Sequence, residues 1–242
     1  RQAYGNASGT NRECSGAAEE YASMVDKLDR QVGAIVDQVR KLGLDKRTII
    51  IFSSDNGHEL YYRTDKGRGR GPDCHGGVLD GTGELLDVFR GSRGRVGPNN
   101  AMANLAGLKW TSHEGGIRVP LIISWPGTLP HGKVCHSLVA NYDHMASFAD
   151  LAGVRMPESK DAVSYIEILS GNSARQRDYV VVDHTVITGD GWKLTQKQNK
   201  PFLFQIGKDP EERHNLAETR KDQLEKLRAI YRKEVGSPRK DR

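Results

Sequence analysis

TIIIFSSDNG, residues 48–57, joins a run of apolar residues to a polar turn. The run at residues 48–52 is rich in β-branched side chains and apolar on both alternating faces. Such a run is typical of a strand that helices cover on both faces in an α/β sheet. The polar residues that follow it would then lie at the carboxyl end of the sheet, where open α/β folds bind ligands.

Helices and further strands are predicted on either side of this run. Apolar residues recur at steps of three and four between residues 21 and 42, with charged residues between them, which predicts an amphipathic helix. Gly43 follows, where a left-handed conformation can end the helix. A second buried strand is predicted at 119–125 and a helix at about 142–152. This alternation predicts an α/β fold.

The pattern changes near residue 157, which predicts two domains. Residues 63–97 contain ten glycines and little periodicity, so we expect a long irregular insertion there. We predict an α/β domain at residues 1–156 and a smaller C-terminal α+β subdomain at 157–242. The expected elements of this subdomain are short strands at 179–182 and 202–206 and a charged helix at about 216–233.

Length and composition favour a globular protein. A chain of 242 residues with 36% apolar content can fill a core. No stretch approaches the roughly 18 to 20 apolar residues of a membrane-spanning helix, so we predict no membrane span. The net charge of +5 is concentrated at residues 63–95 and 232–242. That excess favours anionic partners, although loops and tails are often basic for solubility alone.

The start of the chain and its cysteines suggest processing rather than a disulfide scaffold. Arg1 is not preceded by methionine or by a signal-peptide pattern, so we expect a truncated or processed start. Cys14, Cys74 and Cys135 are far apart and form no C-x-x-C pair, which leaves at most one disulfide open. The triplet at residues 6–8 would permit a glycan in a eukaryotic secretory route.

Asp55 and Asn56 are candidate metal ligands. Carboxylate and amide oxygens are hard ligands that suit calcium or magnesium, and Gly57 lets the backbone turn so that both side chains can face one ion. An Asp-Asn-Gly triplet is, however, usually a plain turn. Both interpretations stay open on the triplet alone.

A second constellation, KWTSHEGGIRVP at residues 109–120, leads into the second predicted strand. Its paired glycines permit unusual backbone angles. Lys109 offers a compact positive charge with three donors, which suits a tetrahedral oxyanion such as sulfate or phosphate, although an exposed surface lysine is the commoner state. We expect Glu114 and Arg118 to form a structural ion pair that holds the turn.

Four segments taken together resemble a known family. IIIFSSDNGHE, LKWTSHEGGIRVPLIISWPG, DHMASFADLAG and GWKLTQ…LFQIGKDPEERHNLAE are similar, in this order, to segments of the type I sulfatases. The resemblance implies an alkaline-phosphatase-like α/β fold covered by helices. It also implies a sulfuric ester hydrolase in which formylglycine, made from a cysteine, attacks a sulfate ester beside a calcium or magnesium ion.

The resemblance gives roles to particular residues. Asp55 and Asn56 would be metal ligands, and Lys109 would be the catalytic residue that holds the sulfate group. His58 and His113 lie beside these positions and are candidates for substrate binding, with ordinary loop histidines as the equal alternative. The family further implies a sulfated small molecule or glycan as substrate and a periplasmic or extracellular location. Nucleic acid is not an expected partner.

The chain also departs from the family pattern. Formylglycine forms in a Cys-x-(Pro or Ala)-Ser-x-Arg setting, and none of the three cysteines has that setting. The family's early acidic ligands, its second lysine and its catalytic histidines belong to segments that would precede Arg1. We therefore expect this chain to be a sulfatase fragment, inactive by itself, with the nucleophile in the parent protein. The resemblance implies that residues 1–156 are the later part of the catalytic domain. Leu108 and the long insertion at residues 63–97 are further departures.

Two other functions remain as alternatives. A phosphate or phosphonate ester hydrolase of the same superfamily would also use a metal and a lysine clamp. A non-catalytic module that binds anions would use the basic residues of the insertion instead. These basic residues of the insertion are Arg63, Lys66, Arg68, Arg70, Arg90, Arg93 and Arg95.

The sequence also contains a helix-start signal near its end. Residues 209–212, Asp-Pro-Glu-Glu, place acidic residues where the first turn of a helix would lie.

Overall fold

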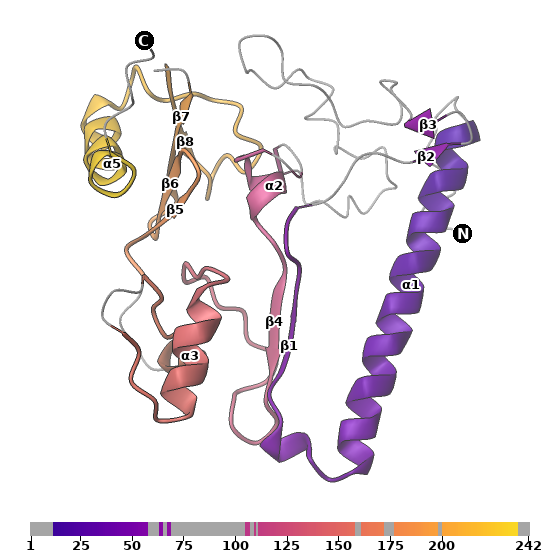
Figure 1. The fold of residues 1–242 in the computed structure, drawn as a ribbon. Helices are drawn as coiled ribbons and strands as arrows, with labels where there is room; N and C mark the ends of the chain where they lie inside the picture. Colours follow the sequence, from indigo (N-terminus) through magenta and orange to yellow (C-terminus); the bar gives the residue numbers. More distant parts are fainter. Residues whose placement is uncertain are drawn as a thin grey trace. The chain divides into compact units, whose positions relative to one another are not determined.

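A computed structural model describes the parts of the chain drawn in colour in Figure 1. They are residues 12–57, 63–64, 67–68, 105–106, 109, 111–157, 161–171, 177–197 and 200–236. The chain forms two compact units. Unit 1 comprises Arg1–Leu44, Phe52–Ile122 and Lys208–His214. Unit 2 comprises Asp45–Ile51, Ile123–Gly207 and Asn215–Arg242. The domain boundary predicted near residue 157 falls within unit 2 and stays a prediction.

Helix α1, Arg12–Lys41, confirms the predicted amphipathic helix and begins earlier than expected. It ends as predicted, because Gly43 has a φ of 66° and Leu44 donates its backbone N–H to the carbonyl of Val39 at 3.1 Å. Several side chains of the apolar stripe are exposed, including Met24 at 69% and Ile35 at 63%. The apolar stripe therefore predicts that α1 forms, but it does not predict what covers the apolar face of the helix.

Strands β1, Ile50–Ser53, and β4, Leu121–Ser124, pair in a two-stranded sheet, and the 3-10 turn η1, Asp45–Arg47, precedes β1 (Figure 1). Both predicted strands are confirmed, but their expected burial on two faces is wrong. No residue of β1 is fully buried, and Ile122 in β4 is 62% exposed. Within the described residues no third strand extends this sheet.

Part of the predicted insertion at residues 63–97 needs correction. Strands β2, Arg63–Thr64, and β3, Gly67–Arg68, form a short antiparallel pair where no regular structure was expected. The two middle residues of this hairpin and the remainder of the insertion lie outside the described residues. The prediction of an irregular loop stays a prediction for that remainder.

Unit 2 contains helix α3, Asp143–Leu151, the short helix α4, Ile166–Leu169, and a four-stranded sheet. The sheet is an antiparallel meander in the order β5-β6-β7-β8 (Figure 1). Two predicted strands are confirmed as β5 and β8, whereas α4, β6 and β7 were not predicted. The strands are β5, Tyr179–Val182; β6, Thr185–Thr188; β7, Trp192–Lys197; and β8, Lys200–Gln205.

Helix α5, Lys221–Glu234, packs against β6 and β7 of this sheet. The core between them includes Leu194, Leu203 and Leu227, each 0% exposed. The predicted start of α5 near residue 216 is wrong, because the preceding chain is tied to β8 instead. The side-chain oxygen of Asn215 accepts the backbone N–H of Leu203 and that of Ala217, both at 3.0 Å.

The helices in the described part of the chain are also relevant to the membrane prediction. None of them combines the length and the apolar character that crossing a bilayer requires.

Candidate active site

The first candidate segment is a bend directly after β1. The hydroxyl of Ser54 donates to the carbonyl of Asn56 at 3.0 Å, and the side-chain amide of Asn56 donates to the carbonyl of Gly57 at 3.0 Å. Asp55 is exposed and Asn56 is half-buried. The bend uses the nitrogen of the Asn56 amide and leaves its oxygen, so both predicted ligands offer an oxygen atom.

Gly57 joins this bend to the second candidate segment. Its backbone N–H donates to the carbonyl of Gly116 at 2.8 Å. A Cβ atom on Gly57 would lie 1.9 Å from the carbonyl oxygen of Gly115, a separation that no side chain tolerates. Glycine is therefore required at position 57 for close approach of two backbones, and the two candidate segments are in direct contact.

The second segment forms a one-turn helix, α2, Glu114–Ile117. Gly115 and Gly116 are buried there, and neither has a positive φ, so the backbone freedom that glycine permits is not used at these positions. The small size of these two glycines allows the backbone of Gly57 to approach α2 closely. The predicted ion pair between Glu114 and Arg118 is confirmed at 3.8 Å, with the carboxylate buried and the guanidinium exposed.

Glu212 is a site residue that sequence reasoning missed. Its buried carboxylate contacts Nδ1 of His113 at 2.8 Å and accepts the backbone N–H of Glu114 at 2.7 Å. The prediction that residues 209–212 start a helix is wrong, because the carboxylate of Asp209 accepts two backbone N–H groups and closes a turn. The sequence offered no signal for this role beyond the acidic pair Glu211 and Glu212.

Of the other predicted site residues, the structure describes Lys109 but not His58. Lys109 is half-buried at a turn, and His58 lies outside the described residues. Within the described part of the chain, no three His, Cys, Asp or Glu side chains are grouped closely enough to hold a metal ion. Asp55 and Asn56 would therefore make up only part of a ligand set. Cys135 is exposed with a free thiol.

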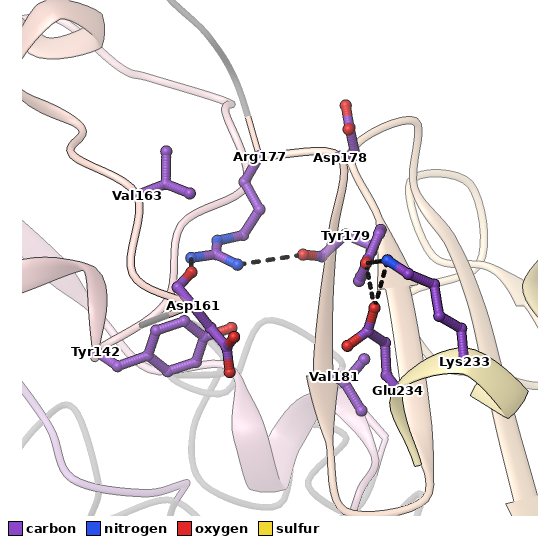
Figure 2. A pocket seen from close by; sticks show the side chains of 9 residues that line it. All are labelled: Tyr142, Asp161, Val163, Arg177, Asp178, Tyr179, Val181, Lys233 and Glu234. Carbon is purple, nitrogen blue, oxygen red and sulfur yellow. Dashed lines mark hydrogen bonds and ion pairs between the residues drawn. The ribbon is translucent and has the colours of Figure 1, made fainter. Parts of the chain in front are cut away.

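Unit 2 has a cavity of about 400 Å³, and Figure 2 shows the nine side chains that line it. On one wall, the guanidinium of Arg177 lies 4.8 Å from the centre of the Tyr142 ring and donates to the carboxylate of the buried Asp143. It also donates to the carbonyl of Asp161 at 2.8 Å. With these partners, Arg177 serves to hold the cavity wall together.

The opposite wall of the cavity is also internally paired. The ammonium of Lys233 lies 2.8 Å from the carboxylate of Glu234 and 3.2 Å from the hydroxyl of Tyr179, which donates to Glu234 at 2.6 Å (Figure 2). The Lys233 bond lowers the pKa of Glu234, and the Glu234 bond raises the pKa of Lys233. These charges satisfy one another, so the cavity is a weaker candidate site than the contact of Gly57 with α2.

The structure is that of an α/β protein with its candidate ligands at a strand end. The family profile described as Sulfatase matches residues 1–154. A profile for the C-terminal region of N-sulphoglucosamine sulphohydrolase matches residues 109–240. The chain belongs to the sulfatase family, which confirms the resemblance carried by the four segments.

Curated relatives and solved structures agree with this assignment. The chain is 31% identical over 147 residues to the arylsulfatase of Klebsiella aerogenes, covering 55% of this chain and 29% of the relative. It is 25% identical over 223 residues to the N-acetylgalactosamine-6-O-sulfatase of Bacteroides thetaiotaomicron, covering 83% of this chain and 39% of the relative.

Among solved structures, the complex of Ps i-CgsB with k-i-k-neocarrahexaose has a TM-score of 0.61 and 24% identity. The match covers 92% of this chain and 44% of that one. This likeness establishes the alkaline-phosphatase-like fold. The chain thus spans less than half the length of these relatives.

Proposed function

We propose that the protein hydrolyses sulfate esters and that this chain supplies part of the metal site and a clamp for the sulfate group. The observation that carries the proposal is the contact between Gly57 and Gly116, because it joins the segment of Asp55 and Asn56 to the turn that follows Lys109. Membership of the sulfatase family supports the type of reaction.

The residues fit calcium or magnesium by their chemistry. The Asp55 carboxylate is exposed, and the Asn56 amide keeps its oxygen while its nitrogen is bonded to Gly57. Two hard oxygen donors on one bend suit such an ion, and further ligands are needed to complete the six to eight that calcium takes. When bound, the ion withdraws charge from the sulfate oxygens.

In this proposal each residue of the chain has a limited role. Asp55 and Asn56 hold the ion, and the ammonium of Lys109 binds an oxygen of the sulfate group. The contact of Gly57 with α2 fixes the spacing between the two segments. The formylglycine nucleophile expected for the family is not assigned to this chain, because none of its three cysteines lies in the sequence setting that formylglycine requires.

A sulfated sugar is the proposed substrate class, and a periplasmic or extracellular location accompanies it. The relative from Bacteroides thetaiotaomicron is named for the 6-O-sulfate of N-acetylgalactosamine, and the solved complex contains an oligosaccharide. Cell fractionation of the source organism would test the location. A chain found only in the cytoplasm would contradict it.

The proposal is tested by steady-state kinetics on the protein expressed from its complete coding sequence. Turnover of 4-nitrophenyl sulfate should disappear with EDTA and return with calcium or magnesium. Lys109→Met and Asp55→Asn should each lower kcat/KM by about 10²-fold or more, since the first removes the proposed sulfate clamp and the second removes a proposed metal ligand. Asp29→Asn, an exposed residue of α1, is the matched control. Turnover of 4-nitrophenyl phosphate in place of the sulfate would overturn the proposal.

A further inference from the structure

Glu212 reaches back to α2 from a position 98 residues further along the chain. Its side chain is fully buried, and its two carboxylate oxygens contact Nδ1 of His113 and the backbone N–H of Glu114. The residue before α2 makes no side-chain cap of its own, so Glu212 supplies the cap from a distance.

The turn around Glu212 is built to hold this carboxylate inward. Glu212 has a φ of 49°, a left-handed conformation that costs a residue other than glycine roughly 1 to 2 kcal/mol. The turn offsets this cost through its own bonds, because Glu212 donates its N–H to the carbonyl of Asp209 at 3.0 Å. The carbonyl of Pro210 accepts the N–H of Ala106 at 3.3 Å, and residues 208–214 accordingly belong to unit 1.

The two contacts determine where the proton on His113 lies. An ionised carboxylate only accepts hydrogen bonds, so Nδ1 of His113 carries the proton and donates it to Glu212. Within the described residues, Nε2 of this ring has no hydrogen-bond partner, and the side chain is 19% exposed. A ring that carries a single proton, held at Nδ1, offers Nε2 as an acceptor at a partly open surface.

His113 belongs to the same turn that meets the candidate metal ligands. It directly precedes Glu114, and Gly116 in that helix accepts the N–H of Gly57. An acceptor at this place cannot bind the sulfate group, which carries negative charge and has no donors. It suits a hydroxyl group beside the sulfate.

We propose that Glu212 is a positioning residue that fixes His113 in the Nδ1–H form, so that Nε2 accepts a hydrogen bond from a hydroxyl of a sulfated sugar. This inference rests on the proposed function and names the feature that would separate a sugar sulfate from a simple aryl sulfate. Glu212 would act only through His113 and would not itself contact the substrate.

Glu212→Gln isolates the effect, since it preserves size while inverting one hydrogen bond. The amide oxygen can still accept the N–H of Glu114, but the amide nitrogen then donates to Nδ1 and drives the proton of His113 to Nε2. Glu212→Asp retains the carboxylate and should retain the Nδ1–H form. Thermal unfolding of each variant checks that the fold is intact.

The first measurement is NMR of protein labelled with 15N-histidine, with the signals of His113 identified by their loss in His113→Gln. The wild type and Glu212→Asp should show the proton on Nδ1, and Glu212→Gln should show it on Nε2. A proton that stays on Nδ1 in Glu212→Gln would overturn the role assigned to the carboxylate.

The second measurement compares two substrates on the protein expressed from its complete coding sequence. Glu212→Gln should raise KM for N-acetylgalactosamine 6-sulfate about 10-fold while changing KM for 4-nitrophenyl sulfate little, because only the sugar presents hydroxyls. Glu218→Gln, an exposed residue nearby in sequence, is the control. In Glu212→Asp, the KM for N-acetylgalactosamine 6-sulfate should lie closer to the wild-type value than it does in Glu212→Gln.

The outcomes separate this inference from the proposed function. Equal losses on both substrates indicate a purely structural Glu212 and overturn the inference alone. A wild type that turns over neither substrate overturns the proposed function and, with it, the hydroxyl contact. The NMR result still decides whether Glu212 controls the proton on His113.

Discussion

Gly57 donates its backbone N–H to the carbonyl of Gly116 at 2.8 Å, and the space where a Cβ of Gly57 would lie is filled by the carbonyl oxygen of Gly115. Two segments that are far apart in sequence thus fit together only because side chains are absent. The contact ties the bend that carries Asp55 to helix α2.

Gly57→Ala should separate these segments. A methyl group 1.9 Å from a carbonyl oxygen forces the backbone to move, which costs about 1 to 3 kcal/mol, and displacement of the ligands by about 1 Å can lower catalysis 10²-fold. Urea unfolding and metal-dependent sulfatase kinetics are the measurements. Gly33→Ala is the control, because its Cβ meets nothing within 4 Å, and it should be neutral or stabilising. Wild-type activity and stability in Gly57→Ala would contradict the close approach.

Asp143→Asn should destabilise unit 2 strongly. The carboxylate of Asp143 accepts from Arg177 and from the backbone N–H groups of Ala140 and Val163, at 2.8 and 2.9 Å. The side chains of Asp143 and Arg177 are only 2% and 9% exposed, so removal of one charge leaves the other buried, at a cost of about 3 to 5 kcal/mol.

Asp150→Asn is the matched control for this substitution, since Asp150 is exposed and, among the described residues, its carboxylate bonds only the hydroxyl of Ser164. It should change the free energy of unfolding by about 0.5 kcal/mol or less. Urea unfolding followed by circular dichroism measures both variants. Similar stabilities for the two would show that the ion pair with Arg177 contributes little.

The stability of unit 2 should fall in alkaline solution through Tyr165. Burial raises the pKa of Tyr165 above its ordinary value of 10.0, and its hydroxyl lies 2.5 Å from Nδ1 of His144. A raised pKa means that the stability from the neutral phenol is fully present below pH 10.0 and is lost as pH rises through the folded-state value.

Tyr165→Phe removes this ionisation. The difference in unfolding free energy between the wild type and Tyr165→Phe should stay constant from neutral pH to about 9 and narrow above pH 10.0. Urea unfolding at a series of pH values provides the measurement. A difference that is unchanged up to pH 11 would argue against a buried phenol at this position.

Leu227→Ala should cost about 2 to 5 kcal/mol, because Leu227 is 0% exposed in the core beneath α5. Leu151→Ala provides the comparison, since Leu151 in α3 is 39% exposed. Thermal and urea unfolding of both variants test the prediction. Equal effects would mean that the core does not depend on α5.

The sequence predicted elements best where one periodic pattern dominated. Helix α1 and strands β1 and β4 carry such patterns, whereas β6 and β7 mix polar with apolar residues. Periodicity identifies a face without identifying what covers it. The exposed side chain of Ile35 in α1 was therefore not predictable.

The candidate site was predictable within each segment but not across segments. The ion pair of Glu114 with Arg118 spans one helical turn, so local spacing was enough to suggest it. The contact of Glu212 with His113 depends on tertiary folding, and the acidic residues around it fit a helix start equally well. Position 57 was predicted as a sharp turn, and the packing reason for its glycine became visible only in three dimensions.

Residues 208–214 belong to unit 1, while the residues immediately before and after them belong to unit 2. A hybrid enzyme that takes everything after residue 157 from a relative would therefore import a foreign partner for His113. If that relative lacked the matching acid, the ring nitrogen and the Glu114 amide would both lose their acceptor. Chimaeric sulfatases made by recombining segments of two relatives should fold and function more often when positions 113 and 212 come from the same relative.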